Sequence, residues 1–145
     1  MKTRTLTILK PDCIKRNLTG KVIDHLLNKG FVILSAKMVF MTKKIAEGFY
    51  AVHKGKGFFD DLVKFMTSGR CIVMVLENED AVNKLREVIG ATDPKEAEEG
   101  TVRKLYAENK QMNIIHASDS DENAQKEIGF FFSSKEIIEN EGTLL

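Results

Sequence analysis

The sequence has few of the features that mark secreted, membrane or nucleic-acid-binding proteins. It contains only two cysteines, Cys13 and Cys71, which lie far apart and in no paired motif, so we expect neither a disulfide framework nor a cysteine metal site. No apolar run approaches the length that spans a bilayer, and the first residues lack the apolar segment of a signal peptide. The formal net charge is only +1, which disfavours a surface for nucleic acid or for membranes. We therefore expect a cytoplasmic protein with no membrane partner and no nucleic-acid partner.

Several common ligand-binding motifs are also missing. The chain has no G-x-x-x-x-G-K-[ST] run, so a P-loop does not hold phosphates, and it has no H-E-x-x-H zinc motif. The segment DSDEN, starting at Asp119, begins like a calcium-binding loop. It then has Ala124 where such a loop needs glycine and Phe130 where it needs glutamate, which excludes that site.

What the chain does contain is a regular alternation of strand and helix patterns. Its 145 residues, 43% of them hydrophobic, are enough for a single globular domain, 1–145, with a buried core. Apolar periodicity predicts strands at 5–10, 31–40, 71–77 and 112–116. It predicts helices at 20–30, 43–55, 58–66, 79–90 and 120–129, and residues 91–100 are polar enough to form a loop.

This order of elements fits two architectures. If the short helices are additions, the core is a ferredoxin-like βαββαβ unit with a four-stranded antiparallel sheet, in the α/β (α+β) class. The regular alternation of strands and helices also fits a doubly wound parallel sheet. The pattern alone does not separate the two.

Three charged side chains stand where the pattern expects apolar ones. Lys10 ends a strand on its apolar face, Arg86 flanks the apolar stripe of its helix, and Glu127 falls on the stripe of the last helix. Lys10 and Arg86 each fit simple snorkelling at the edge of an element. Glu127 is harder to explain, because an inward carboxylate costs several kcal/mol unless it is paired or hydrogen-bonded.

His116 is an attractive partner for that carboxylate. It ends the strand 112–116, and only a short turn separates it from the helix that carries Glu127. A lone histidine is most often a structural residue, whereas a histidine oriented by a carboxylate is a candidate catalyst. The residues themselves leave both interpretations of His116 open. His25, off the apolar stripe of its helix, and His53, at a helix end, are weaker candidates.

The segment NIIHASDSDENAQKEIGFFF closely resembles the active-site segment of nucleoside diphosphate kinases, whose pattern is N-x-x-H-G-S-D-S followed by K-E-I-G. TLTILKPD resembles the opening strand of that family, GFFDDLVKFMTSG its nucleotide-binding helical segment, and LREVIGATDPKEAEEGTVR its arginine helix and loop. The resemblance covers essentially the whole chain in the same order. It implies the ferredoxin-like fold and a ping-pong reaction with Mg²⁺, in which a phosphohistidine passes the γ-phosphate of a nucleoside triphosphate to a nucleoside diphosphate. It also implies a homo-oligomer, either a tetramer or a hexamer.

The resemblance assigns the chemistry to one pair of residues. His116 corresponds to the histidine that takes up the phosphoryl group, and Glu127 to the carboxylate that holds the other ring nitrogen. Imidazole suits this role because its ordinary pKa of about 6.5 leaves a neutral, nucleophilic nitrogen at pH 7. Phosphoryl transfer otherwise needs positioning and positive charge. The family's phosphate contacts carry over to Lys10, Arg86, Thr92 and Arg103.

The remaining site residues carry over in the same way. Tyr50 corresponds to a tyrosine that orients the lysine, and Phe58 to an aromatic residue that stacks on the base. Asn113 corresponds to an asparagine that binds the 3′-hydroxyl of the sugar together with Lys10. The metal is expected to ride on the phosphates and on water, without a protein cage of its own. Strict strand alternation, however, places Asn113 and His116 on opposite faces.

The chain departs from the family pattern at a few positions, and two other functions compete with the kinase. The departures are Cys13, Gly57, Glu99, Lys110 and Ala117, which bear on subunit assembly and the base pocket more than on the chemistry. One competing function is a catalytically silent module that binds nucleotides or single-stranded nucleic acid, and the other is a phosphatase that works through phosphohistidine. The intact pair of His116 and Glu127 counts against a silent module, and release of phosphate to water without an acceptor would mark the phosphatase.

Overall fold

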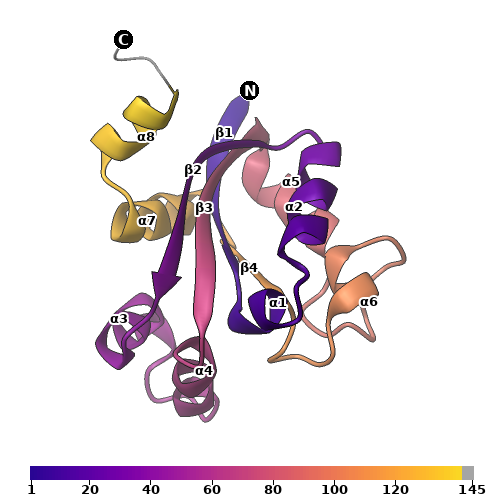
Figure 1. The fold of residues 1–145 in the computed structure, drawn as a ribbon, viewed down its shortest axis with the longest axis vertical. Coiled ribbons are helices and arrows are strands. Elements are labelled where there is room, and N and C mark those ends of the chain that lie inside the picture. Colours follow the sequence, from indigo (N-terminus) through magenta and orange to yellow (C-terminus); the bar gives the residue numbers. More distant parts are fainter. Residues whose placement is uncertain (142–145) are drawn as a thin grey trace.

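The computed structural model describes residues 1–141, and within them four strands form one sheet in the order β2-β3-β1-β4 (Figure 1). The strands are β1 (Lys2–Leu9), β2 (Val32–Phe40), β3 (Arg70–Glu79) and β4 (Ile115–Ala117). β1 pairs antiparallel with both β3 and β4, and β2 pairs antiparallel with β3 at one edge of the sheet. The antiparallel pairing confirms the ferredoxin-like prediction and excludes the doubly wound parallel sheet.

Helices connect the strands and cover the sheet. They are α1 (Pro11–Lys15), α2 (Thr19–Asn28), α3 (Lys43–Phe49), α4 (Phe59–Met66), α5 (Ala81–Ile89), α6 (Val102–Tyr106), α7 (Asp121–Phe131) and α8 (Ser134–Glu141). Periodicity predicted five of these, but not α1, α6 or α8. α1 and α6 are only five residues long, too short for an amphipathic pattern to be recognised. No helix in the described part combines the length and the hydropathy needed to cross a membrane.

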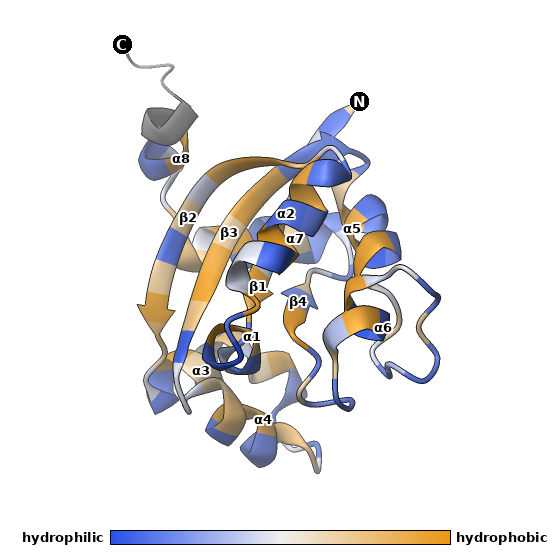
Figure 2. Ribbon diagram, turned by 45° about the vertical axis from the view of Figure 1, so that its right-hand side comes forward, coloured by the Kyte–Doolittle hydropathy of each residue, from blue (hydrophilic) through white to orange (hydrophobic). Residues whose placement is uncertain are grey.

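Two apolar clusters fill the two faces of the sheet, whose strands are coloured mainly as hydrophobic in Figure 2. Leu6, Ile8 and Val75 belong to the cluster that includes residues of α3, α4, α7 and α8. Met74 and Leu76 belong to the other cluster, with residues of α1, α2, α5 and α6. Burying a side chain of this size contributes roughly 1.5–3 kcal/mol. The strands are therefore fixed from both sides, and their ends can hold polar side chains at defined positions.

Two predicted elements differ from the structure. The strand predicted at 112–116 begins only at Ile115, because Ile114 has a φ of +75°, which no strand residue adopts. The helix predicted at 43–55 is wrong in its second half, since α3 ends at Phe49 and a separate 3₁₀ turn follows at Ala51–His53. Both differences matter for the site, because they change the direction of the chain before His116 in β4 and before His53 in the 3₁₀ turn.

Gly90 ends α5 in a conformation that other residues avoid. Its φ is +88°, and a Cβ atom built on it would lie 2.5 Å from Thr101 Oγ1 and 2.8 Å from Thr101 Cβ. Its carbonyl oxygen also accepts a hydrogen bond from Arg103 Nη1 at 3.0 Å. The turn after α5 therefore depends on glycine for both its backbone angle and its close contact.

We predict that Gly90→Ala lowers the free energy of unfolding by roughly 2 kcal/mol or more, because strain at positive φ adds to the overlap with Thr101. Urea denaturation followed by circular dichroism measures the change. Gly20→Ala is the matched control: Gly20 lies in α2, and a Cβ atom added to it would meet no atom within 4 Å, so alanine there is expected to stabilise by up to roughly 1 kcal/mol. Equal midpoints for the two variants would contradict the prediction.

Candidate active site

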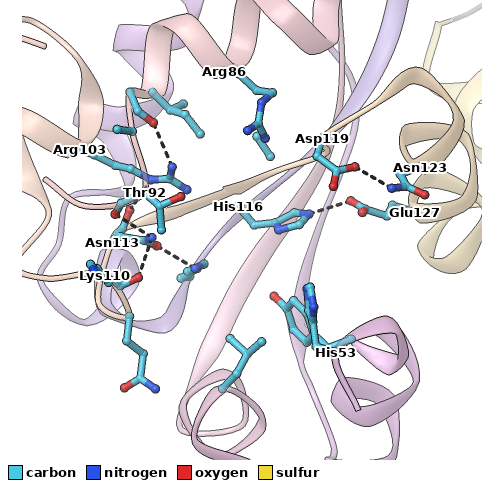
Figure 3. A pocket seen from close by; sticks show the side chains of 18 of the residues that line it. His53, Arg86, Thr92, Arg103, Lys110, Asn113, His116, Asp119, Asn123 and Glu127 are labelled. Carbon is cyan, nitrogen blue, oxygen red and sulfur yellow. Dashed lines mark hydrogen bonds and ion pairs between the residues drawn. The ribbon is translucent and has the colours of Figure 1, made fainter. Parts of the chain in front are cut away.

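All nine residues singled out from the sequence line one pocket of about 1310 Å³. It is bordered by the segment from α3 to α4, the end of α5, the loop that follows α5, β4 and α7. The nine residues are Lys10, Tyr50, Phe58, Arg86, Thr92, Arg103, Asn113, His116 and Glu127. In Figure 3 Arg86 and His53 approach the centre of the pocket from opposite sides, and His116 points across it toward Glu127. The structure thus brings together residues that are spread over most of the chain.

His116 is held by a carboxylate at one ring nitrogen. β4 places it opposite Ile8 of β1, on the sheet face that α7 covers. Its Nε2 lies 2.7 Å from Glu127 Oε1, and the Ser118 hydroxyl donates to the same oxygen at 2.9 Å. A carboxylate oxygen only accepts, so Nε2 carries the proton and Nδ1 keeps its lone pair. With Nε2 bound to Glu127, Nδ1 is the ring nitrogen whose lone pair is available to react.

Lys10 and Asn113 form a second polar contact in the pocket. Lys10, only 7% exposed, follows the last residue of β1, and its Nζ donates to Asn113 Oδ1 at 2.7 Å. The Asn113 amide in turn donates to the backbone oxygen of Lys110 at 2.9 Å and to that of Thr92 at 3.4 Å. Burial, reinforced by the nearby Arg103 charge, lowers the pKa of Lys10 to about 8. Lys10 is therefore a cation that water stabilises poorly.

Arg103 is buried, and most of its N–H groups bind backbone oxygens. Its guanidinium donates to three carbonyl oxygens: Gly90 at 3.0 Å, Asn113 at 3.4 Å and Ile115 at 2.7 Å. Guanidinium has five N–H groups, so two remain for an anion in the pocket. Burial and the charge of Arg86 lower the pKa of Arg103 to about 10. Within the described residues no carboxylate oxygen lies within 4.0 Å of Lys10, Arg86 or Arg103 to form an ion pair.

Tyr50 and Phe58 line the pocket from the segment that joins α3 to α4. The Tyr50 ring is buried, and its hydroxyl has no hydrogen-bond partner among the described residues, so a bond to Lys10 is not formed. Phe58 is 50% exposed although it is a large apolar residue. Its neighbour Phe59 is buried in the core, which leaves the Phe58 ring free to face a ligand.

Three residues of this site were not predicted from the sequence. His53, expected only at the end of a helix, lines the pocket with its ring centroid 5.3 Å from that of Phe58, and burial lowers its pKa. Ser118 binds Glu127, and strand alternation from His116 is the signal that could have found it. Asp119 also lines the pocket, and its hydrogen bond from Asn123 lowers its pKa. Nothing in the local pattern separates Asp119 from an ordinary turn residue.

Comparisons with known proteins agree on one family. The family model described as nucleoside diphosphate kinase matches residues 3–137. The nucleoside diphosphate kinase of Chlorobium chlorochromatii is 56% identical over 135 residues, 93% of this chain and 96% of that protein. The structure of the Aquifex aeolicus nucleoside diphosphate kinase superposes with a TM-score of 0.91 at 44% identity, over 94% of this chain and 99% of the other. A Halobacterium salinarum nucleoside diphosphate kinase in complex with CDP gives a TM-score of 0.89 at 37% identity, over 94% of this chain and 91% of the other.

We predict that the buried charge of Lys10 makes stability depend on pH. The folded pKa of about 8 lies below the ordinary value of 10.5, so the unfolded chain binds more protons between these values, and stability rises as pH increases through this window. Lys10→Met removes this contribution. The stability of Lys10→Met relative to the wild type should therefore fall by about 3 kcal/mol between pH 7 and pH 10.5.

Urea unfolding at a series of pH values measures this difference. Lys104→Met is the control, because Lys104 is an exposed lysine in α6, next to Arg103 in sequence. A difference between Lys10→Met and the wild type that stays constant with pH would show that Lys10 is not a strained cation.

Proposed function

Because this chain belongs to the nucleoside diphosphate kinase family, it is a phosphotransferase that passes a γ-phosphate between nucleotides through a phosphohistidine, and we propose that His116 is that histidine. The observation that carries the assignment is the 2.7 Å contact from His116 Nε2 to Glu127, which leaves Nδ1 unprotonated beside a cationic pocket. The rest of the site follows from what this atom has to do.

The reaction runs in two displacements at phosphorus, and Nδ1 is the nucleophile in the first and the leaving group in the second. The Nδ1 lone pair attacks the γ-phosphorus, the N–P bond forms, and the bond to the β-phosphate oxygen breaks, so that the nucleoside diphosphate leaves with the electron pair. A terminal phosphate oxygen of a second nucleoside diphosphate then attacks the same phosphorus, the N–P bond breaks, and its electron pair returns to Nδ1. Positive charge grows on the ring as the N–P bond forms, and Glu127 stabilises it through the Nε2 proton. Ser118 fixes Glu127, so neither group has to reorient during the reaction.

Two buried cations, Lys10 and Arg103, and the exposed Arg86 are proposed to supply the electrostatic part of catalysis. Lys10, Arg86 and the two unused N–H groups of Arg103 are proposed to bind the phosphate oxygens, with Thr92 adding a hydroxyl donor. The Tyr50 hydroxyl, which has no partner among the described residues, is proposed to donate to the phosphoryl group or, with phosphate bound, to accept a hydrogen bond from Lys10. Phosphoryl transfer depends mainly on such positioning and charge.

The nucleoside end of the substrate is proposed to lie between Phe58 and Asn113. An exposed aromatic ring stacks on any base, because every base has a π-face, so broad base specificity follows. Asn113 and Lys10 bind one another, which supports the proposal that they share the 3′-hydroxyl of the sugar. The Halobacterium relative in complex with CDP supports a diphosphate ligand in this pocket.

Mg²⁺ is proposed to enter with the nucleotide. Asp119 is the acidic residue that fits it, since this carboxylate lines the pocket and its lowered pKa keeps it ionised to accept hydrogen bonds from the metal's water ligands. The ion neutralises part of the phosphate charge when it is bound.

We also propose that the chain is one domain and acts as a cytoplasmic homo-oligomer, a tetramer or a hexamer. The support is the edge strand β2, which leaves three large apolar side chains exposed: Val32, Met38 and Phe40. Met38 and Phe40 share one face of β2, and the register shift between Ile33 and Ser35 puts Val32 on the other. Exposed apolar groups on an edge strand favour contact with another chain. A second copy of this chain is the partner that a homo-oligomer implies.

The test of the function is transfer of label from γ-labelled ATP and Mg²⁺ without an acceptor. We predict that the wild type and His25→Ala, a control in α2, acquire acid-labile, alkali-stable label, whereas His116→Ala acquires none because it lacks the attacking nitrogen. Addition of any nucleoside diphosphate should discharge the label. Bound nucleotide without label would support a silent binding module, and label lost only to water would support a phosphatase.

We predict that Glu127→Gln still becomes phosphorylated, but roughly five- to tenfold more slowly. The glutamine oxygen still accepts the Nε2 proton, but a hydrogen bond to a charged acceptor contributes about 1–1.5 kcal/mol more than one to a neutral acceptor. Rapid-quench measurement of the first turnover gives the rate. A wild-type rate in this variant would mean that Glu127 only packs against His116 and does not stabilise its charge.

We predict that Phe40→Glu reduces the size of the assembly, because a carboxylate on this edge cannot be buried against another chain without cost. Light scattering coupled to gel filtration measures the mass. A variant with the same mass as an oligomeric wild type would place the subunit contact elsewhere, and a monomeric wild type would contradict the proposed assembly.

A further inference from the structure

A three-residue turn separates Asn113 from the strand that carries His116. The Ile115 N–H donates to the Asn113 carbonyl oxygen at 2.8 Å, and Ile114 between them has a φ of +75°. This is a γ-turn of the rare, strained kind, and a β-branched residue is among the least suited to it. The turn nevertheless explains a contradiction in the sequence: it breaks strand alternation, so Asn113 and His116 both line the same pocket.

Residues 10–12, between β1 and the first turn of α1, bind both the N–H and the carbonyl oxygen of Ile114. Asp12 Oδ2 accepts a hydrogen bond from the Ile114 N–H at 3.1 Å, and the Lys10 N–H donates to the Ile114 carbonyl oxygen at 2.9 Å. The Ile114 side chain is fully buried in the apolar cluster beneath. The strained residue is therefore fixed from three directions, and of its two hydrogen bonds only the one to Asp12 involves a side chain.

Asp12 is buried in the first turn of α1, near the positive charge of Lys10, and its side chain reaches the turn at Ile114 through this bond. It is 6% exposed, and its second oxygen, Oδ1, has no hydrogen-bond partner among the described residues. Burial raises the pKa of its carboxyl, while the bond from Ile114 opposes that rise. Asp12 is not among the residues that line the pocket, so it acts on a substrate only through another group.

We propose that Asp12 is a positioning residue for phosphoryl transfer, which accepts the Ile114 N–H and so keeps Asn113 and His116 on the same side of the bound nucleotide. The inference rests on the proposed roles of Asn113 at the 3′-hydroxyl and of His116 at the γ-phosphate. One turn then sets the spacing between the two ends of the substrate that must be held at once. Loss of Asp12 lets Ile114 relax toward an extended conformation, which turns Asn113 away from His116.

The experiment compares ATP with 3′-deoxy-ATP in the first turnover of His116 phosphorylation. Asp12→Ala is expected to react about tenfold more slowly with ATP, because small misplacements of reacting groups are costly. The preference for ATP over 3′-deoxy-ATP should fall about fivefold with it, since the Asn113 contact is lost in the same step. Asp12→Asn should restore both values to near those of the wild type, because the amide oxygen still accepts the Ile114 N–H and the amide nitrogen replaces an oxygen that has no partner among the described residues.

Val22→Ala is the control for stability alone. Val22 lies in α2 and is buried in the same cluster as Ile114, but its side chain has no group that could hydrogen-bond the turn, so its truncation should lower stability and leave the ATP preference unchanged. If Asp12→Ala does not fold, Asp12→Glu, which moves the acceptor oxygen, should lower the same preference. An unchanged preference in the folded Asp12 variant, or Asp12→Asn as impaired as Asp12→Ala, would overturn the proposal. Absence of label on His116 in the wild type would instead overturn the proposed function.

Discussion

The structure depends on keeping two cations, Lys10 and Arg103, buried without a carboxylate of the described residues at ion-pair distance. Burial, with repulsion from neighbouring cations, lowers the pKa of Lys10 to about 8 and that of Arg103 to about 10. Neither residue has an ion-pair partner within the described part of the chain. Such a site costs folding free energy until an anion arrives, and a phosphoryl group that gains charge in the transition state relieves that cost most. The burial and mutual repulsion of these cations thus oppose folding and promote catalysis.

The rest of the fold supplies the rigidity that this charge requires. Lys10 follows directly on β1, whose residues Leu6 and Ile8 are fully buried, so its backbone cannot move away from the site. Arg103 is fixed by three backbone carbonyl oxygens, and one of them belongs to Gly90, at the turn that only glycine fits. Relaxation of either cation toward water would disrupt these contacts. The apolar clusters on both faces of the sheet therefore stabilise the site as well as the fold.

Much of the site could be predicted from the sequence, and the parts that could not have local causes. Glu127 and Lys10 break an apolar stripe, which is a signal that periodicity detects, and their positions are confirmed as part of the pocket. Asn113 could be assigned only by resemblance, because a γ-turn at a β-branched residue contradicts every local preference. His53 was misjudged because α3 ends at Phe49, and the 3₁₀ turn after it follows no apolar period. Propensity and period fail here where tertiary hydrogen bonds and packing determine the backbone.

Three of the departures from the family pattern, Cys13, Lys110 and Ala117, are explained by where they lie in the structure. Cys13 is fully buried in the apolar cluster, where a thiol acts as a small hydrophobic group, and Ala117 pairs with Thr7 at the end of β4. Lys110 lies at the pocket, but it is the backbone oxygen of Lys110 that accepts the Asn113 amide, so this contact does not depend on which side chain stands there. Backbone groups also supply the contacts of Arg103 and Asp12. A site built so largely on main-chain atoms tolerates substitution around it, provided that the few side chains which bind the main chain are kept.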